Sequence, residues 1–108
     1  MKRIEALVRP AALENIKEGL ASAEVRGLTV SEARVFGCIQ RRGVYRGSAH
    51  TLDFAPALKI EIVAPEAHVP RILEALAHSS AGGDSKVIVS SVVDAIRIRT
   101  NEHGEDAL

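Results

Sequence analysis

The residues with the greatest potential for chemistry lie in one long connection, residues 36–53, which reads FGCIQRRGVYRGSAHTLD. In it Arg41, Arg42 and Arg46 are interleaved with glycines and with Tyr45. Guanidinium groups bind carboxylates and phosphates through paired, charge-assisted hydrogen bonds. Compact domains rarely carry a structureless connection of this length unless it has a use. The segment is therefore predicted to be a binding loop; the alternative is a solvated hairpin extension with arginines for solubility.

Patterns typical of enzymes and metal sites are absent from the sequence. It contains no GxxxxGK[ST] phosphate loop, no GxSxG motif and no convincing nucleophile beside a base, so no enzymatic activity is predicted. The four histidines lack the spacing of metal ligands, which leaves only a metal shared between subunits as an open alternative. Nearby arginines would favour the thiolate of Cys38, the single cysteine, although an inert thiol is the more ordinary interpretation.

Composition excludes several classes of partner. Lysine plus arginine and aspartate plus glutamate both number 14, so the chain has no overall positive charge to attract nucleic acid or an acidic membrane. Aromatic residues make up 3% of the chain, which argues against base stacking. No apolar run is long enough to span a bilayer, and no apolar signal core precedes Pro10. A cytoplasmic protein of one domain is expected, with no nucleic-acid partner and no membrane insertion.

The elements that must position the loop follow from the periodicity of apolar residues. Apolar side chains at helical spacing predict two helices, the first ending before Gly27 and the second beginning within residues 65–68 because of Pro70. Runs with strand character, two of them with the two-residue alternation of a strand, predict four strands. The predicted strands cover residues 2–8, 28–36, 57–63 and 87–93, and the predicted helices cover residues 11–23 and 67–79.

This order of elements, β-α-β-β-α-β, is that of the α+β ferredoxin-like plait, a four-stranded antiparallel sheet with two helices on one face. We expect one domain over residues 1–100 with a tip loop at 37–53, a brief extended segment at 95–99 and a polar, mobile tail at 101–108. Apolar strand residues such as Leu7 and Ile88 occur at both parities, so the second face of the sheet is also partly apolar. A partner subunit is expected to cover it.

With the plait in place, five segments resemble the PII signal-transduction family in collinear order from residue 1 to about residue 100. They read MKRIEALVRP, GLTVSEARVFG, YRGSAHTLDF, LKIEIV and AIRIRT. The resemblance implies a homotrimer with adenine nucleotide, ATP, ADP or AMP, in the clefts between subunits. It also implies that the loop at residues 38–52 docks on a protein partner, such as a membrane transporter or an enzyme of nitrogen metabolism.

The resemblance also implies a set of nucleotide contacts. Three residues match the slot for the base, one glycine matches a close approach to phosphate, and the short glycine-rich turn wraps the phosphates. Two arginines match a basic pair from the neighbouring subunit. These positions are, in chain order, Thr29, Gly37, Cys38, Glu61, Val63, Gly83, Asp84, Lys86, Arg97 and Arg99. Taken singly, each is equally typical of an ordinary strand residue or a solvated edge.

Departures from the family pattern bear on the ligand. Cys38 and Ile39 stand where the family has an arginine for phosphate and a glutamine for magnesium and 2-oxoglutarate, and Gln40 lies one position late. Ala57 replaces the lysine that pairs with 2-oxoglutarate. Losing one charge-assisted hydrogen bond, worth about 1.5–3 kcal/mol, weakens binding about tenfold or more. Binding of 2-oxoglutarate is therefore not expected, and the role of Mg²⁺ stays open.

The phosphate-wrapping turn is also shortened, to SSAGGDSK at residues 79–86. With fewer backbone N–H groups to converge on phosphate, the site is expected to prefer ADP or AMP to ATP, or to have lost nucleotide. Arg41 or Arg42 is a candidate replacement for the missing phosphate-binding arginine.

The loop carries the predicted partner contacts Arg41, Arg42, Tyr45, Arg46 and Ser48. His50 stands where many members have a uridylylated tyrosine, and it cannot accept that modification. Ser48 matches a phosphorylatable position with Arg46 nearby, although a plain polar loop residue is the simpler interpretation. Two alternatives remain: a constitutive scaffold without nucleotide, and a PII-like sensor of a different small molecule or ion.

Overall fold

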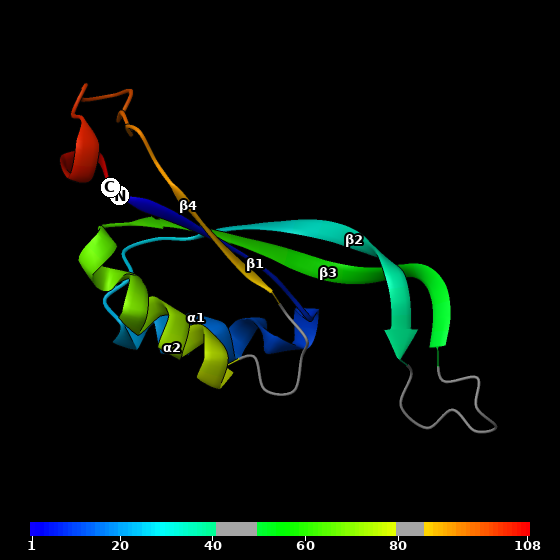
Figure 1. Cartoon of the computed structure of the whole chain (residues 1–108). Helices are drawn as coiled ribbons and strands as arrows, with labels where there is room; N and C mark the ends of the chain where they lie inside the picture. The colour runs from blue at the N-terminus through cyan, green and yellow to red at the C-terminus, as the bar shows by residue number, and fades with distance from the viewer. Residues whose placement is uncertain (41–49, 80–85) are drawn as a thin grey trace.

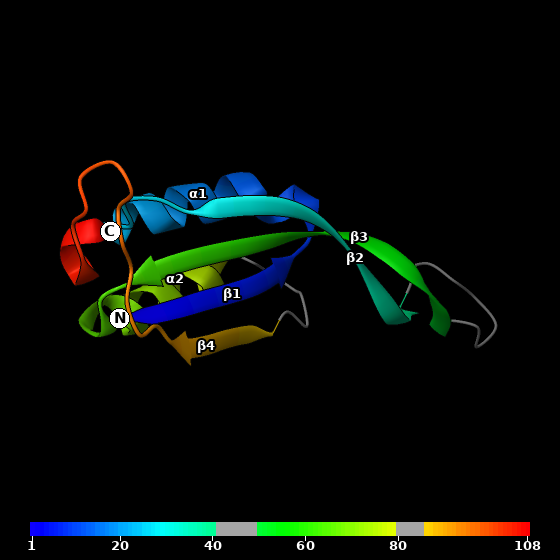
Figure 2. The ribbon, with the colours of Figure 1, turned by 90° about the horizontal axis from the view of Figure 1, so that it is seen from above.

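The computed structural model describes residues 1–40, 50–79 and 86–108, with the main chain alone at residues 37–40 and 50–52. Four strands form one sheet, β1 (Lys2–Val8), β2 (Thr29–Gln40), β3 (His50–Ala64) and β4 (Val87–Ser91). Their order is β2-β3-β1-β4, and every neighbouring pair is antiparallel (Figure 2). This is the order of the ferredoxin-like plait, so the fold predicted from the sequence is confirmed.

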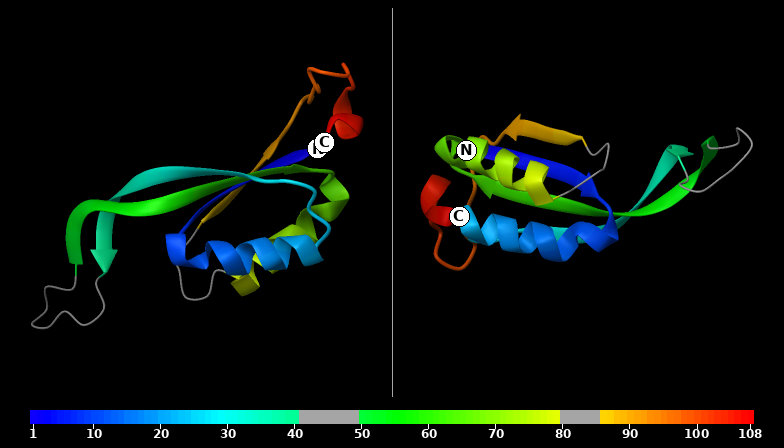
Figure 3. Two further views of the ribbon diagram at one scale, coloured as in Figure 1. Left: turned by 180° about the vertical axis from the view of Figure 1, so that it is seen from behind. Right: turned by 90° about the horizontal axis from the view of Figure 1, so that it is seen from below.

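Two helices, α1 (Leu13–Ser22) and α2 (Val69–Ser79), lie side by side on one face of this sheet (Figures 1 and 3). Each follows a short 3-10 turn. Pro70 is the second residue of α2, where its missing N–H has no partner to lose. The first helix ends at Ser22, five residues before Gly27, and Glu24 takes the left-handed conformation (φ 62°). The helix predicted over residues 11–23, ending before Gly27, therefore agrees with the 3-10 turn and helix observed over residues 10–22.

The core lies between this helical layer and the sheet. Alternate residues of β1 and β3 point toward the helices and are buried, because successive side chains of a strand face opposite sides. The buried apolar cluster consists of Ile4, Ala6, Val8, Ile16, Leu20, Ile60, Ile62, Ala64, Ile72 and Leu76. The intervening residues of the central strands form the opposite face of the sheet, here called the open face because no helix covers it.

Strands β2 and β3 extend well past the rest of the sheet as a two-stranded hairpin, here called the arm (Figure 1). They stay paired as far as Gln40 and His50, whereas strands ending at residue 36 and starting at residue 57 were predicted. The exposed rings of Phe36 and Phe54 pair across the strands, with centroids 5.0 Å apart. Such cross-strand aromatic contacts stabilise a hairpin. The expected loop over residues 37–53 is therefore strand at both ends.

The tail segment, residues 101–108, folds back on the chain. The main-chain N–H of Arg97 donates to the carbonyl of Glu102 at 2.9 Å, and that of Gly104 donates to the carbonyl of Ala95 at 2.9 Å. A short 3-10 helix, Gly104–Ala107, follows. Of the extended segment expected at residues 95–99, Ile96 forms an isolated antiparallel bridge with His103, whereas residues 98–100 are a turn.

Asp94 anchors this turn. Its carboxylate accepts hydrogen bonds from Nδ1 of His103 at 3.0 Å and from the main-chain N–H groups of Ala95 and Gly104. The bond from His103, followed by the main-chain donors, holds the pKa of Asp94 below its ordinary value, although desolvation opposes the shift. The ionised carboxylate is thus the form that keeps the turn closed.

We expect Ile4→Ala to lower the free energy of unfolding by about 2–5 kcal/mol, because it leaves a cavity in a fully buried site. Ile4→Val, which removes one methyl group, should cost about 0.5–1.5 kcal/mol. Urea denaturation followed by circular dichroism at one fixed protein concentration measures both values. Equal stability of the two variants would contradict the core described here.

Closure of the turn should also depend on pH. Because the folded state lowers the pKa of Asp94, its contribution is complete above the unfolded-state pKa and is lost as the pH falls through the folded-state pKa. The amide resonance of Gly104 in NMR spectra should therefore shift in acid. Asp94→Asn should abolish that transition, and its persistence in the variant would contradict the assignment.

Candidate functional site

A cavity of about 920 Å³ lies where β2 begins, β3 ends and the tail segment packs. Its lining includes four of the residues predicted to contact nucleotide, Thr29, Glu61, Val63 and Arg97. The structure thus brings together residues that are up to 68 positions apart in the sequence. All four come from elements whose geometry is fixed by the sheet or by the turn that Asp94 anchors.

Strand pairing explains this convergence. Thr29 and Glu61 are register partners on neighbouring strands, and Val63 follows Glu61 at the two-residue spacing that returns to the same face. Arg97 reaches them from the turn after β4. Within one chain, Arg97 lines the same cavity as Thr29. The expectation from the resemblance that Arg97 serves a site completed by a neighbouring subunit stays a prediction.

The guanidinium group of Arg97 is held by the tail segment. Its Nη2 donates to the main-chain oxygens of Ala107 and Leu108, at 3.3 and 3.1 Å. Its Nε lies 3.9 Å from the carboxylate of Glu102, an ion pair too long for a hydrogen bond. That Nε atom is buried and has no hydrogen-bond partner within the described residues. The contacts therefore satisfy only part of the guanidinium's capacity for donation.

Several charged residues of the cavity were not identified from the sequence. Arg26 and Glu24 come from the connection before β2, His68 from the turn before α2, and Glu105 and Asp106 from the tail segment. The position of the first two beside Thr29 is a signal that sequence reasoning could have used. No comparable signal exists for the tail, because its placement depends on main-chain contacts of Arg97.

The other predicted contacts lie elsewhere in the chain. Lys86 is exposed and immediately precedes β4, on the opposite edge of the sheet from Thr29, about 14 Å away across three strand spacings. Gly37 pairs with Asp53 on the arm, about 27 Å along β3 from Glu61. Neither lines the cavity, so one chain does not assemble the whole predicted site.

The remaining predicted contacts add little to the cavity. Arg99 is exposed in the turn after Arg97, and the main chain of Cys38 continues β2 on the arm. The other predicted contacts lie outside the described residues; these are Gly83, Asp84, Arg41, Arg42, Tyr45, Arg46 and Ser48.

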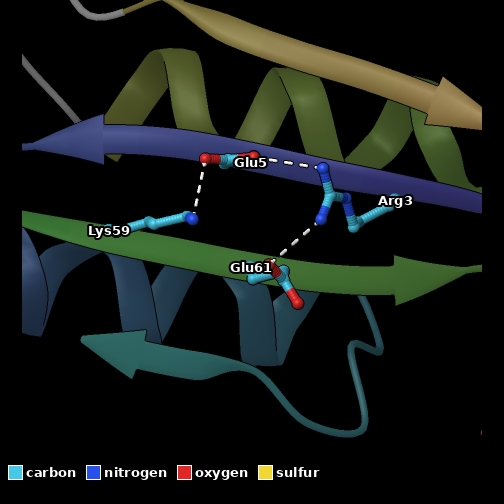
Figure 4. A network of polar contacts seen from close by, with 4 residues as sticks. All are labelled: Arg3, Glu5, Lys59 and Glu61. Atoms are coloured by element: carbon cyan, nitrogen blue, oxygen red, sulfur yellow. Dashed lines mark hydrogen bonds and ion pairs between the residues drawn. The ribbon is translucent and has the colours of Figure 1, made fainter.

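A network of charges occupies the open face beside the cavity (Figure 4). Arg3 contacts the carboxylates of Glu5 and Glu61, at 3.4 and 3.6 Å, and Lys59 contacts Glu5 at 3.1 Å. Glu61 belongs to both the network and the cavity lining. Leu7 and Ile88, apolar side chains beside the charges on the same face, stay partly exposed, and so does Val35 further along β2 on the arm. This face is suited to a protein contact.

Among the side chains that the structure describes, no three acidic, cysteine or histidine residues gather closely enough to hold a metal ion. None of the helices in the described part of the chain has the length and apolar character needed to cross a bilayer.

Comparison with known proteins places this geometry in a family. The model of the family "Nitrogen regulatory protein P-II" matches residues 1–102. Proteins named nitrogen regulatory protein P-II from Azospirillum brasilense and Cereibacter sphaeroides are 41% and 44% identical to this chain, each over the full length of both sequences. Both alignments span 114 positions, so the relatives carry residues that this chain of 108 lacks.

Solved structures agree. The chain superposes on the structure of B. subtilis GlnK with a TM-score of 0.80 at 32% identity, covering 99% of this chain and 97% of that one. A B. subtilis GlnK–ATP complex gives a TM-score of 0.79 at 29% identity, covering 99% and 96%. The relatives' names denote regulatory proteins, so the predicted regulatory, non-enzymatic role is confirmed. Matched over nearly its whole length, the chain belongs to the nitrogen regulatory protein P-II family.

Proposed function

We propose that this chain is a cytoplasmic, homotrimeric regulator that binds ATP, ADP or AMP in clefts between subunits and controls a partner protein through residues 38–52. The observation that carries the proposal is the shared cavity of Thr29, Glu61, Val63 and Arg97. The similar GlnK chain, which forms a complex with ATP, supports adenine nucleotide as the ligand.

A homotrimer accounts for the division of the predicted site. Lys86 and Gly37 lie away from the cavity of their own chain, so a second copy must bring its Lys86 and the part of its arm that holds Gly37 to the cavity of the first. The open face supports the same conclusion. Leu7 and Ile88 are partly exposed beside charges that already pair with one another, and Val35 is partly exposed further along the same face. Another subunit could cover this face without burying an unpaired charge.

The nucleotide would act on the partner through the arm. Gly37 sits within β2 on the arm, so phosphate bound against its main chain would connect directly to the strands that carry the loop. Such a switch requires the ligand to bind two arm conformations with different affinity. The partner is a transporter or a metabolic enzyme, the class that the family resemblance suggests.

The replacements noted in the sequence define the ligand further. Cys38 and Ile39 offer no cation or side-chain amide on the arm, and Ala57 has no charge for a second carboxylate. We therefore propose that 2-oxoglutarate is not an effector and that the shortened turn at residues 79–86 favours ADP or AMP over ATP.

Replacing Lys86 or Arg99 with alanine should weaken ADP binding about tenfold or more, since each loses a charge-assisted bond to phosphate. Lys17→Ala, which removes an exposed cation on α1 outside the cavity lining, is the matched control. Isothermal titration calorimetry with ATP, ADP and AMP, with and without Mg²⁺ and 2-oxoglutarate, measures the effect. Unchanged affinity in both variants would remove these residues from the site, and no binding by the wild-type protein would favour a constitutive scaffold.

Placing a charge on the open face should break the trimer. Ile88→Asp puts a carboxylate at an exposed apolar position paired in register with Glu5. Ala77→Asp, on the exposed side of α2, is the control. We expect light scattering after gel filtration to show a trimer for wild type and control, and smaller species for Ile88→Asp. A trimer that survives Ile88→Asp would exclude this part of the open face from the interface.

A further inference from the structure

The tail segment and the proposed nucleotide site share one cation. Arg97 lines the cavity and, at the same time, donates through Nη2 to the main-chain oxygens of Ala107 and Leu108. These oxygens accept from the same Nη2 group that would donate to a bound phosphate. The tail helix lies at the end of the molecule where β2 begins and β3 ends, consistent with its residues in the cavity lining (Figure 2).

The tail also sets the charge of the cavity. The lining holds four carboxylates, on Glu24, Glu61, Glu105 and Asp106, against two guanidinium groups, on Arg26 and Arg97. Two of the four carboxylates come from the tail. The other two, on Glu24 and Glu61, are paired with Arg71 and Arg3, which lie outside the lining. The tail carboxylates therefore offset the two guanidinium groups, and displacing the tail would leave the lining with a net positive charge that attracts a polyphosphate.

The contact between Arg97 and the tail segment is weak enough to be reversible. The Arg97 side chain stays 41% exposed, and its Nε lacks a hydrogen bond among the described residues, so the hold is screened by solvent and incomplete. Two oxygens of a phosphate can accept hydrogen bonds from two different nitrogens of a guanidinium group at once. The two main-chain oxygens of the tail instead share the single nitrogen Nη2.

The segment is also hinged at a fixed point. Asp94 holds His103 and the N–H of Gly104, so the chain up to Gly104 stays attached to the turn while the residues beyond it carry the contacts with Arg97. Displacement requires only the last residues to move.

We propose that the tail segment is an internal competitor for the phosphate site: it occupies Arg97, adds negative charge to the cavity, and must be displaced before nucleotide binds. This inference rests on the proposed function. A tail docked about nine-tenths of the time weakens apparent affinity about tenfold, because only the free fraction binds. Discrimination should rise with ligand charge, so the tail penalises ATP more than ADP.

The test compares nucleotide affinity in assembled proteins that differ in tail charge. The double variant Glu105→Gln with Asp106→Asn should bind ADP several-fold more tightly and ATP about tenfold more tightly than wild type, by isothermal titration calorimetry. A control pair, Glu18→Gln with Glu32→Gln, makes the same change in net charge at exposed positions outside the cavity lining and should bind as wild type does. Equal affinity of all three proteins overturns the competition and leaves the proposed function intact.

A second readout follows the tail itself and, in one of its two comparisons, needs no nucleotide. Hydrogen–deuterium exchange at residues 105–108 should accelerate in Arg97→Gln, and in wild type on saturation with ADP. Protected tail amides in both cases overturn the proposal. If neither wild type nor any variant binds nucleotide, both the proposed function and the competition fail. Faster exchange in Arg97→Gln would then still show that Arg97 holds the tail, whereas unchanged exchange would show that it does not.

Discussion

The pairing of β3 with both of its neighbours is the constraint on which the rest of the structure depends. Its last seven residues pair with β1, and β2 runs beside it for twelve positions. Along the part that pairs with β1, Ile60 and Ile62 enter the core, whereas Lys59 and Glu61 face the other way. A slip of one residue would exchange these sets, burying charges and exposing isoleucines. The same register that builds the core therefore also fixes the cavity and the charge network.

The body of the fold was predictable because its elements bury one face. Alternation in β1 and β3, and helical spacing in α1 and α2, arise from contact with a single core, and that contact leaves a pattern in the sequence. The arm has no face buried against a core, because it consists of β2 and β3 alone and no helix that the structure describes packs on it. Its pairing depends on main-chain hydrogen bonds and on contacts such as that between Phe36 and Phe54, which leave no periodic trace. The glycines and arginines of this segment are typical of a loop, so the sequence did not predict that its ends are strands.

The candidate site was predictable only in part, and for a different reason. Thr29 and Glu61 are unremarkable strand residues by type, and nothing but resemblance to a family singled them out. Their place in one cavity follows from register, which the sequence does not state. The contribution of Glu105 and Asp106 was missed because the tail is held by Asp94 and by main-chain oxygens on Arg97. Neither contact has a sequence spacing by which it could be recognised.

The arm has a mechanical consequence. Strand β1 stops opposite Leu58, and from there to His50 the two strands run on without a third, for about 27 Å. A paired ribbon resists stretching but twists at its base, so it behaves as a lever with a fulcrum where β1 ends. A rotation of about 10° at the fulcrum moves the far end by about 5 Å, given the length of the extended strands. Small changes where β1 ends, opposite Leu58, are thereby magnified at a surface remote from the core, which itself need not rearrange.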